Sequence, residues 1–476
     1  MTVTSHEEEK NVKKWYKKVP HVFTLLIIII FLCTLLTYIV PAGEFDRVSV
    51  EGTSREIVVA GSYHNVESSP IGILDMFKAI PEGFAASSSI IAMILFSSGA
   101  FAVMSESGAI ENILSIFLKR SGKKKQSGII VIWTCTFLFS ILGIFIGPEV
   151  HVPFTVITVA IALGLGYDTI VGMAILLGGA VGFSTAPINA AVIGTCDAIS
   201  GLPLFSGMGL RTVFWFCSTV ATCIVITLYA NKIKKNPEKS YVYGLDTTGL
   251  DLLKEDDEVK ISKRQYGVLL CLLGIFIATI IGCTQFGWYL DEMTAVFIIG
   301  GILAGLIAGF NSEKIAQCFI NGATNVVFGA LCVGIARGIQ IVLENGHIAD
   351  TIIQAAAEPL TDLPTIIGAI AMTVIHALIN FLIPSGSGQA AATMPIMFPI
   401  GDLLGITKQT SILIFQIGAG IPDILYPTVG SLMAVCALAK VPFEKWVRFS
   451  IKLSAVIFLL GWIFVMIAIA IQWGPF

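Results

Sequence analysis

Residues 383–399 read IPSGSGQAAATMPIMFP, a run in which prolines, glycines and hydroxyl side chains interrupt apolar sequence. Backbone that leaves the helical path inside a membrane is tolerated only where protein buries it or where it lines a wet cavity, because lipid cannot satisfy its polar groups. Three related runs are GPEVHVP at 147–153, GFSTAPINAA at 182–191 and GAGIPDILYPTVGS at 418–431. Each half of the chain has two such runs in matching order, so they predict a cavity formed by two hairpins and two broken helices.

The composition around these runs is that of a membrane protein. Of the 476 residues, 55% are hydrophobic and 13% are charged, whereas soluble domains carry about 25% charged residues. Crossing a bilayer takes about 20 apolar residues. We expect membrane segments near 22–41, 88–106, 127–147, 151–165, 169–200, 210–230, 266–285, 293–309, 325–345, 363–383, 387–402, 408–439 and 446–472.

The remaining composition excludes several other classes of protein. The net charge is −3, and no basic stripe interleaved with aromatics indicates nucleic-acid binding. The 10 cysteines include no CxxC pair and no cysteine–histidine ligand spacing, so we expect neither a metal site nor a resident cofactor. HExxH and GxSxG are both absent, which argues against an intramembrane enzyme. A channel would show pore-lining rings or a repeated filter motif.

An internal duplication is visible in the sequence. MSESGAIENIL at 104–114 parallels VLENGHIADTI at 342–352, FIGPEVHVP at 145–153 parallels FLIPSGSGQ at 381–389, and Gly83 parallels Gly322. Unrelated apolar segments would not keep one offset. We therefore divide the chain into a cytoplasmic tail, a first membrane repeat, a cytoplasmic linker and a second membrane repeat, at 1–20, 21–230, 231–265 and 266–476.

The orientation follows from the basic residues. Lys and Arg concentrate in the tail, at 119–125, in the linker and at 440–448, and such clusters remain on the cytoplasmic side. This pattern is consistent only if 127–165 and 363–402 each return to the side where they start. We expect the first to be a re-entrant hairpin from the cytoplasm and the second one from outside, which makes the repeats inverted. The N-terminus is then cytoplasmic and the C-terminus external, in a multi-pass protein of the cell membrane.

Polar side chains inside the four runs are the candidate site. Ionisable residues at membrane depth are candidates for function by default, and Glu149 and Asp423 lie in opposite halves, so the two carboxylates could converge. The candidate solute-binding residues are Glu149, His151, Ser184, Thr185, Asn189, Ser385, Gly386, Ser387, Gly388, Gln389, Asp423 and Thr428, and the helix-breaking residues are Pro148, Pro187, Pro422 and Pro427.

Structural roles remain open for several ionisable residues. His151 could instead be the partner of Glu149, two residues away. Glu106 and Glu344 are related by the repeat and fall near helix ends, which favours solvated or hinge positions. Arg337 lies deep in a helix, where it is either a counter-ion for the solute or the partner of a buried carboxylate. Asp197 and Asp402 are interpreted as loop-edge residues.

These motifs resemble the anaerobic four-carbon dicarboxylate carrier family of the ion transporter superfamily. Within it they resemble the YfcC-like branch, which includes arginine/ornithine exchangers. The most specific pieces are 383–399, GFSTAPINAAVIGT at 182–195 and KVPFEKWVRF at 440–449, and the likeness covers almost the whole chain. It implies a scaffold domain, a transport domain with two re-entrant hairpins, elevator-type movement and a homodimer. One departure is Ala419 in FQIGAGIPD, where the branch often has an acidic residue and this chain places Asp423 further on.

The resulting expectation is an all-α polytopic secondary transporter, either an antiporter or an ion-coupled symporter. Its partners are membrane lipid and a small charged solute, and sodium or a proton is the candidate coupling ion. Glu149 and Asp423 suit an ammonium or guanidinium group, so an amino acid is favoured, a basic one included. A four-carbon dicarboxylate or another small carboxylate is the alternative, which would suit a site with Ser, Asn and helix N-termini and few carboxylates.

Overall fold

The computed structural model describes residues 22–49, 56–113, 116, 125–145, 147–189, 192–247, 250, 261–286 and 288–474. The predicted cytoplasmic tail and most of the basic cluster at 119–125 lie outside the described residues. The first half contains α2 (Val22–Leu36), α3 (Ile73–Ala86), α4 (Ser88–Glu106), α6 (Lys125–Phe145), α7 (Pro148–His151), α8 (Thr155–Gly164), α9 (Thr169–Ser184), α10 (Ile193–Ser200) and α11 (Met208–Lys235). The second half contains α12 (Lys263–Gln285), α13 (Leu290–Ala308), α14 (Ser312–Asn345), α15 (Ala349–Ala357), α16 (Thr365–Leu382), α17 (Gly386–Leu403), α18 (Lys408–Gly420), α19 (Gly430–Leu438) and α20 (Phe443–Ala470).

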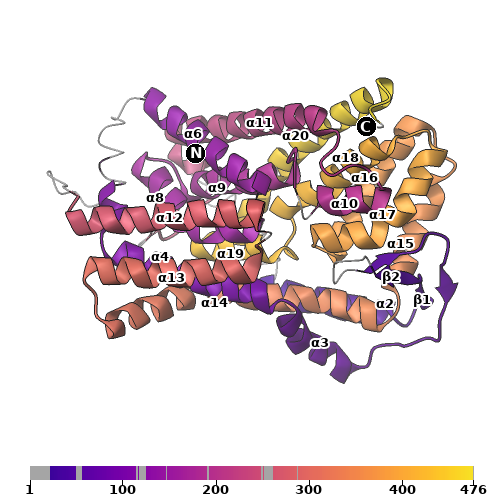
Figure 1. The fold of residues 1–476 in the computed structure, drawn as a ribbon, viewed down its shortest axis with the longest axis horizontal. Coiled ribbons are helices and arrows are strands. Elements are labelled where there is room, and N and C mark those ends of the chain that lie inside the picture. The colour runs from indigo at the N-terminus through magenta and orange to yellow at the C-terminus, as the bar shows by residue number, and fades with distance from the viewer. Residues whose placement is uncertain are drawn as a thin grey trace, which may run out of the picture.

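The described chain is a bundle of membrane-length helices. Seven of the described helices, namely α4, α6, α11, α13, α14, α16 and α20, are long and apolar enough to cross a membrane. Helices α11 and α20 run side by side along one edge of the molecule, and α14 lies with α2 and α3 along the opposite edge (Figure 1). Large apolar side chains such as Leu228, Leu270 and Leu459 remain exposed, as lipid-facing surfaces require.

The structure adds elements that the sequence analysis did not predict and shifts the ends of two helices. The helical fold class is confirmed, and two short antiparallel pairs are added to it: β1 (Gly43–Glu44) pairs with β4 (His64–Asn65), and β2 (Arg47–Ser49) pairs with β3 (Glu56–Val58). Helix α3 was not among the predicted segments, since Pro81 and Glu82 interrupt its apolar run. Helix α14 begins at Ser312 rather than at 325, and α11 continues through Lys235 into the predicted linker.

Helices α3 and α4 cross α14 at two related glycine contacts. A Cβ added at Gly83 would lie 2.7 Å from the Gly338 nitrogen, and one added at Gly322 would lie 2.7 Å from the Gly99 Cα. The offset that relates Gly83 to Gly322 also relates Gly99 to Gly338. Gly83 thus meets Gly338, the counterpart of Gly99, and Gly322, the counterpart of Gly83, meets Gly99. A two-fold axis between repeats produces such an exchange of partners.

The four runs quoted first all end or interrupt helices. Gly147 is extended and Pro148 begins α7, where a missing amide hydrogen is tolerated, so α6 turns into α7, the 3₁₀ turn η1 (Val152–Phe154) and α8. Helix α16 turns into α17 through the N-cap Ser385, whose hydroxyl accepts from the Gly388 amide at 3.3 Å. Helix α9 ends at Ser184, and α18 ends at Gly420 before the 3₁₀ turn η4 (Ile421–Ile424). Both helices therefore end inside the runs predicted to break them.

Two polar clusters fix opposite ends of α11. At its end, Tyr229 and Ser240 each donate to the Asp168 carboxylate at 2.6 Å, which joins the turn between α8 and α9 to the linker. At its start, the fully buried Arg211 donates to Gln409 on α18. The hydroxyl of Thr407 donates to the Trp473 carbonyl at 2.6 Å. The turns that follow the two hairpins thus lie at opposite ends of one membrane-length helix.

Candidate functional site

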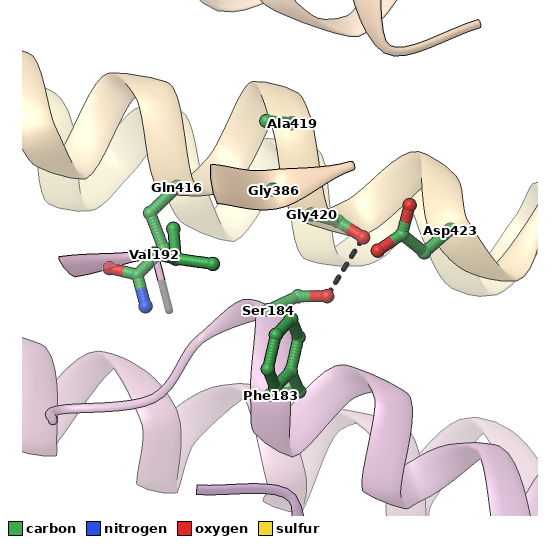
Figure 2. Close-up of a pocket in the computed structure, with 8 residues that line it drawn as sticks. All are labelled: Phe183, Ser184, Val192, Gly386, Gln416, Ala419, Gly420 and Asp423. Carbon is green, nitrogen blue, oxygen red and sulfur yellow. Dashed lines mark hydrogen bonds between the residues drawn. The ribbon is translucent and has the colours of Figure 1, made fainter. Parts of the chain in front are cut away.

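A cavity lies where α9 and α18 end and α17 begins. It is a small cavity lined by Phe183, Ser184, Val192, Gly386, Gln416, Ala419, Gly420 and Asp423. Both halves contribute, because Phe183 and Ser184 belong to α9 while Gln416 and Gly420 belong to α18 (Figure 2). Three of the four sequence runs contribute lining residues, and the fourth, 147–153, approaches through Glu149.

The two helix ends are joined directly across the cavity. The Ser184 hydroxyl, at the end of α9, donates to the Gly420 carbonyl at 2.8 Å, and this bond crosses the cavity wall in Figure 2. The amide of Gln416 donates to the Ala186 carbonyl at 2.7 Å. Its other side-chain atom, Oε1, is buried without a hydrogen-bond partner in the described residues. An unsatisfied acceptor in a cavity wall is available to a donor on a solute.

Asp423 is the only acidic residue among those that line the cavity. Its carboxylate projects toward the end of α18 beside Gly420 (Figure 2). Glu149, at the first hairpin tip, is close enough to Asp423 for the two carboxylates to repel each other. The structure therefore brings together the acidic residues that the sequence places in opposite halves. None of the residues that line the cavity is a lysine or arginine.

Helix ends add to this charge pattern. The carbonyl ends of α9 and α18 carry a partial negative charge, whereas the N-terminus of α17 at Gly386 carries a partial positive charge. The two kinds of helix end thus offer favourable partners to groups of opposite charge. An added Cβ at Gly386 would lie 2.7 Å from Val192, so the small residue lets the second hairpin approach the α9–α10 break.

Several predicted site residues are used to hold the backbone. The Thr185 hydroxyl donates to the Val181 carbonyl at 2.8 Å, and the side-chain Oδ1 of Asn189 accepts from the Val192 amide at 3.1 Å. Gln389 is fully buried and donates to the His376 carbonyl at 2.7 Å, which ties α17 to α16. These three side chains are directed at neighbouring backbone and are not among those that line the cavity.

Most of the other predicted residues do not line the cavity. His151 is buried beside Gly179, with Nδ1 3.2 Å from the Gly147 carbonyl and Nε2 without a partner among the described residues, so it braces its own hairpin turn. Ser387 and Gly388 are partly or fully exposed at the start of α17. The Thr428 hydroxyl is buried in the second break without a partner in the described chain. The breaks are kept open by Pro148, Pro187, Pro422 and Pro427, none of which lines the cavity.

Sequence reasoning missed Gln416 and the apolar lining residues Phe183 and Val192. Gln416 lies in a continuous helix, where a polar residue among apolar ones was the available signal. Asn380 was also missed, and it donates to the Ala419 carbonyl at 2.7 Å and lies beside Asp423. The carbonyls that face the cavity have no signature in a side-chain pattern.

The remaining ionisable residues lie outside the cavity. Glu106 pairs with Lys314 at an exposed helix end. Arg337 donates to Gln340, which in turn donates to Glu344 at 2.6 Å. Asp197 is buried, and it accepts from the Phe205 amide at 2.7 Å. Asp402 is exposed at the end of α17, as expected of a loop-edge residue.

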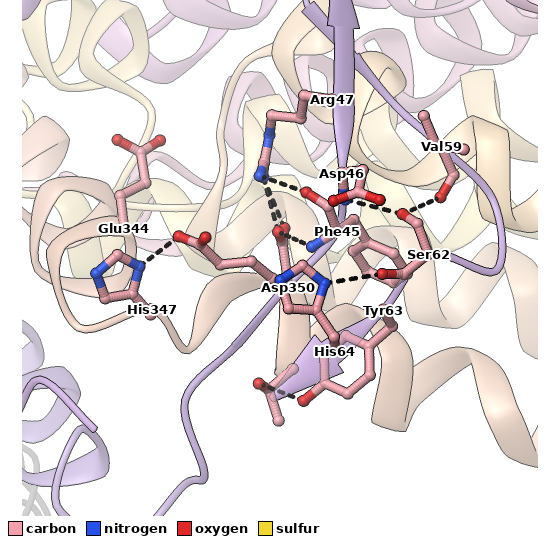
Figure 3. Close-up of polar contacts among 12 residues, drawn as sticks. Phe45, Asp46, Arg47, Val59, Ser62, Tyr63, His64, Glu344, His347 and Asp350 are labelled. Carbon is pink, nitrogen blue, oxygen red and sulfur yellow. Dashed lines mark hydrogen bonds and ion pairs between the residues drawn. The ribbon is translucent and has the colours of Figure 1, made fainter. Parts of the chain in front are cut away.

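A separate polar cluster anchors the strands to the start of α15. The buried Asp350 carboxylate accepts from Arg47 at 2.8 and 2.9 Å and from the Phe45 amide at 3.0 Å (Figure 3). His347 pairs with Glu44 beside it, and Glu344 lies at the near end of α14 (Figure 3). Strand β3 also packs against α17, so this cluster positions the outer surface of the second hairpin.

A polar cavity between broken helices of a membrane-length bundle is the arrangement of a membrane transporter. The sequence matches the family described as DcuC, C4-dicarboxylate anaerobic carrier, over residues 19–470. The chain belongs to this family, and it is a multi-pass secondary transporter of a small molecule rather than an enzyme.

Similar proteins span nearly the whole chain. It is 29% identical to the proposed basic amino acid antiporter YfcC of Escherichia coli strain K12, over 95% of this chain and 96% of that protein. It is 26% identical to an uncharacterized protein of Haemophilus influenzae Rd, over 95% and 97% of the two chains. Among solved structures, the YdaH transporter of Alcanivorax borkumensis is 16% identical with a TM-score of 0.43, over 96% of this chain and 100% of that chain. MtrF of Neisseria gonorrhoeae is 17% identical with a TM-score of 0.46, over 94% and 95%. Neither structural likeness carries a functional argument.

Proposed function

We propose that this transporter moves an amino acid, with a basic amino acid favoured, by exchange or by ion coupling. The observation that supports this most is the cavity lining, which combines the Asp423 carboxylate with the unpaired Gln416 acceptor and contains no basic side chain. An ammonium or guanidinium group offers several donors and a positive charge to such a wall. The name of the E. coli relative points to the same class of solute.

The opposite wall suits the carboxylate of an amino acid. The N-terminus of α17 presents free amide groups and a partial positive charge at Gly386. Ser385 and Ser387 lie at the same tip and can donate hydroxyl hydrogens. A zwitterion with an additional positive group would therefore meet a favourable partner at both ends.

A four-carbon dicarboxylate is the second candidate, because the family description names it. One carboxylate would fit the α17 tip, but the other would face Asp423 and two carbonyl helix ends. Two negative charges repel each other strongly in a site that is shielded from water. A dicarboxylate would therefore need Asp423 to be protonated or a bound cation beside it.

The architecture in this proposal is a pair of inverted repeats, each with a re-entrant hairpin and a broken helix. Its support is the exchanged contacts of Gly83 and Gly322, together with the matching contacts of Gly182 with Ser140 and Gly418 with His376. The bond between Ser184 and Gly420 joins equivalent residues of the two halves. An elevator-type transport domain on a scaffold, in a homodimer, is the arrangement implied by the resemblance.

The proposed orientation has the linker in the cytoplasm. Its support is that Lys232, Lys234 and Lys235 in the last turn of α11 share one end of the molecule with the linker, and cationic loops are retained inside. The turn at 165–168 is bonded to that end and the turn at 403–408 to the other. The C-terminus, bonded through Trp473, would then be external, in the cell membrane.

Purified protein in proteoliposomes tests the proposal. Uptake of labelled arginine, ornithine, lysine, succinate and fumarate would be measured with each solute, or none, inside the vesicles, and with sodium or proton gradients. We expect uptake of a basic amino acid that accelerates with a basic amino acid inside. Uptake of dicarboxylates alone would refute the solute class.

A further inference from the structure

A cluster of lysines and tyrosines lies where α11 ends and α20 begins. The ammonium groups of Lys232 and Lys452 lie 5.9 and 5.5 Å from the centre of the same ring, that of Tyr241. Lys452 also donates to the Tyr241 hydroxyl at 2.7 Å. Tyr241 stacks on Tyr229 at 5.2 Å, which holds the ring in place against α11. We call Lys232, Tyr241 and Lys452 the lysine–tyrosine cluster.

The positive charge of this cluster is not balanced by the described part of the protein. Neither Lys232 nor Lys452 forms an ion pair among the described residues. The nearby Asp168 carboxylate is occupied by Tyr229, Ser240 and the Val171 amide. Two cations held at one aromatic ring repel each other, so a bound anion would stabilise both.

Apolar surface continues from each lysine into the membrane. On α11, Leu228 and Ile224 lie one and two turns before Lys232, and they are 66% and 45% exposed. On α20, Val456, Leu459 and Ile463 follow Lys452 on the same face and are 38%, 57% and 48% exposed. The two helices pack side by side in opposite directions (Figure 1). Both lysines therefore lie at the same end of these apolar stripes.

We propose that the lysine–tyrosine cluster binds the phosphate of an anionic phospholipid headgroup, with the acyl chains along the exposed faces of α11 and α20. A ligand with a negative head and apolar tails matches both features of this surface. Basic residues at the inner interface of membrane proteins attract anionic lipids in this way. The site is separate from the solute cavity, and it does not depend on which solute is carried.

The test uses full-length protein in nanodiscs or detergent with phosphatidylglycerol or phosphatidylcholine. Lipid binding is followed by native mass spectrometry and by the melting temperature. We expect phosphatidylglycerol to bind and stabilise the wild type more than phosphatidylcholine does. Each lysine contributes about fivefold in affinity, so Lys232→Gln with Lys452→Gln should weaken phosphatidylglycerol binding roughly 30-fold.

The controls separate this site from general charge effects. Lys263→Gln removes an exposed lysine at the start of α12 and should leave phosphatidylglycerol binding unchanged. If the double variant does not fold, Lys452→Gln alone should show the roughly fivefold loss. Equal phosphatidylglycerol binding by wild type and lysine variants would overturn the proposal. Displacement of the lipid by soluble glycerol phosphate at equal concentration would also overturn the proposal, because the apolar faces of α11 and α20 would then contribute nothing to binding.

Discussion

Replacing Asp423 by Asn tests the charge assignment of the cavity most directly. The substitution keeps the shape of the side chain and its contact with Asn380, but it removes the negative charge beside the end of α18. A hydrogen bond to a charged group contributes about 1.5 to 3 kcal/mol. Affinity for a solute with an ammonium or guanidinium group should therefore fall roughly tenfold to a hundredfold.

The assay is concentration-dependent uptake of labelled arginine and ornithine into proteoliposomes. Succinate is measured in parallel, and its binding should be unchanged or tighter because a like charge has been removed. Asp402→Asn is the matched control, since Asp402 is an exposed acid at the end of α17, away from the cavity. A folded Asp423→Asn protein with wild-type KM for the basic amino acids would refute the reasoning.

Four further outcomes are expected. Glu149→Gln should weaken transport of solutes with an amino or guanidinium group without weakening dicarboxylate transport, and wild-type affinity and pH dependence would make Glu149 structural. Ser387→Ala should raise KM without changing thermal stability. Ser385→Ala and Asn189→Ala should raise KM and also lower thermal stability, because Ser385 caps α17 and Asn189 accepts from the Val192 amide. Unchanged KM in all three variants would remove the hairpin tip from the site. Gly322→Ala should lower the free energy of unfolding by about 1 to 3 kcal/mol, because its Cβ would meet the α4 backbone. Gly274→Ala, where the added Cβ meets open space, should not lower it. Equal melting temperatures for Gly322→Ala and the wild type would contradict the close crossing. Cysteines placed at 166 and 403 should react with an impermeant maleimide from the inside and the outside respectively, and labelling of 166 only from outside would contradict the inverted repeats.

The sequence alone was sufficient for the class of protein and for the positions of the helix breaks. Long apolar segments predict membrane helices, and proline near glycine at Pro187 and Pro422 predicts a break, although Pro395 and Pro399 lie inside α17. The sequence also predicts an internal duplication, because motifs such as Gly83 and Gly322 recur at a nearly constant offset. The acidic pair could be proposed, since a carboxylate such as Glu149 inside apolar sequence needs a reason to be there.

Tertiary structure alone decided which side chains face the cavity. Gln389 and Asn189 look like solute ligands in the sequence, yet each bonds nearby backbone, because a broken helix leaves carbonyls and amides that something must satisfy. The sequence could mark Gln416 only as a polar residue in an apolar helix, since its exposure to the cavity depends on where α9 ends opposite it. The charge of the site likewise depends on carbonyl ends of helices that approach from both halves. Local sequence specifies where a helix stops, but only packing specifies what the freed groups and their neighbours face.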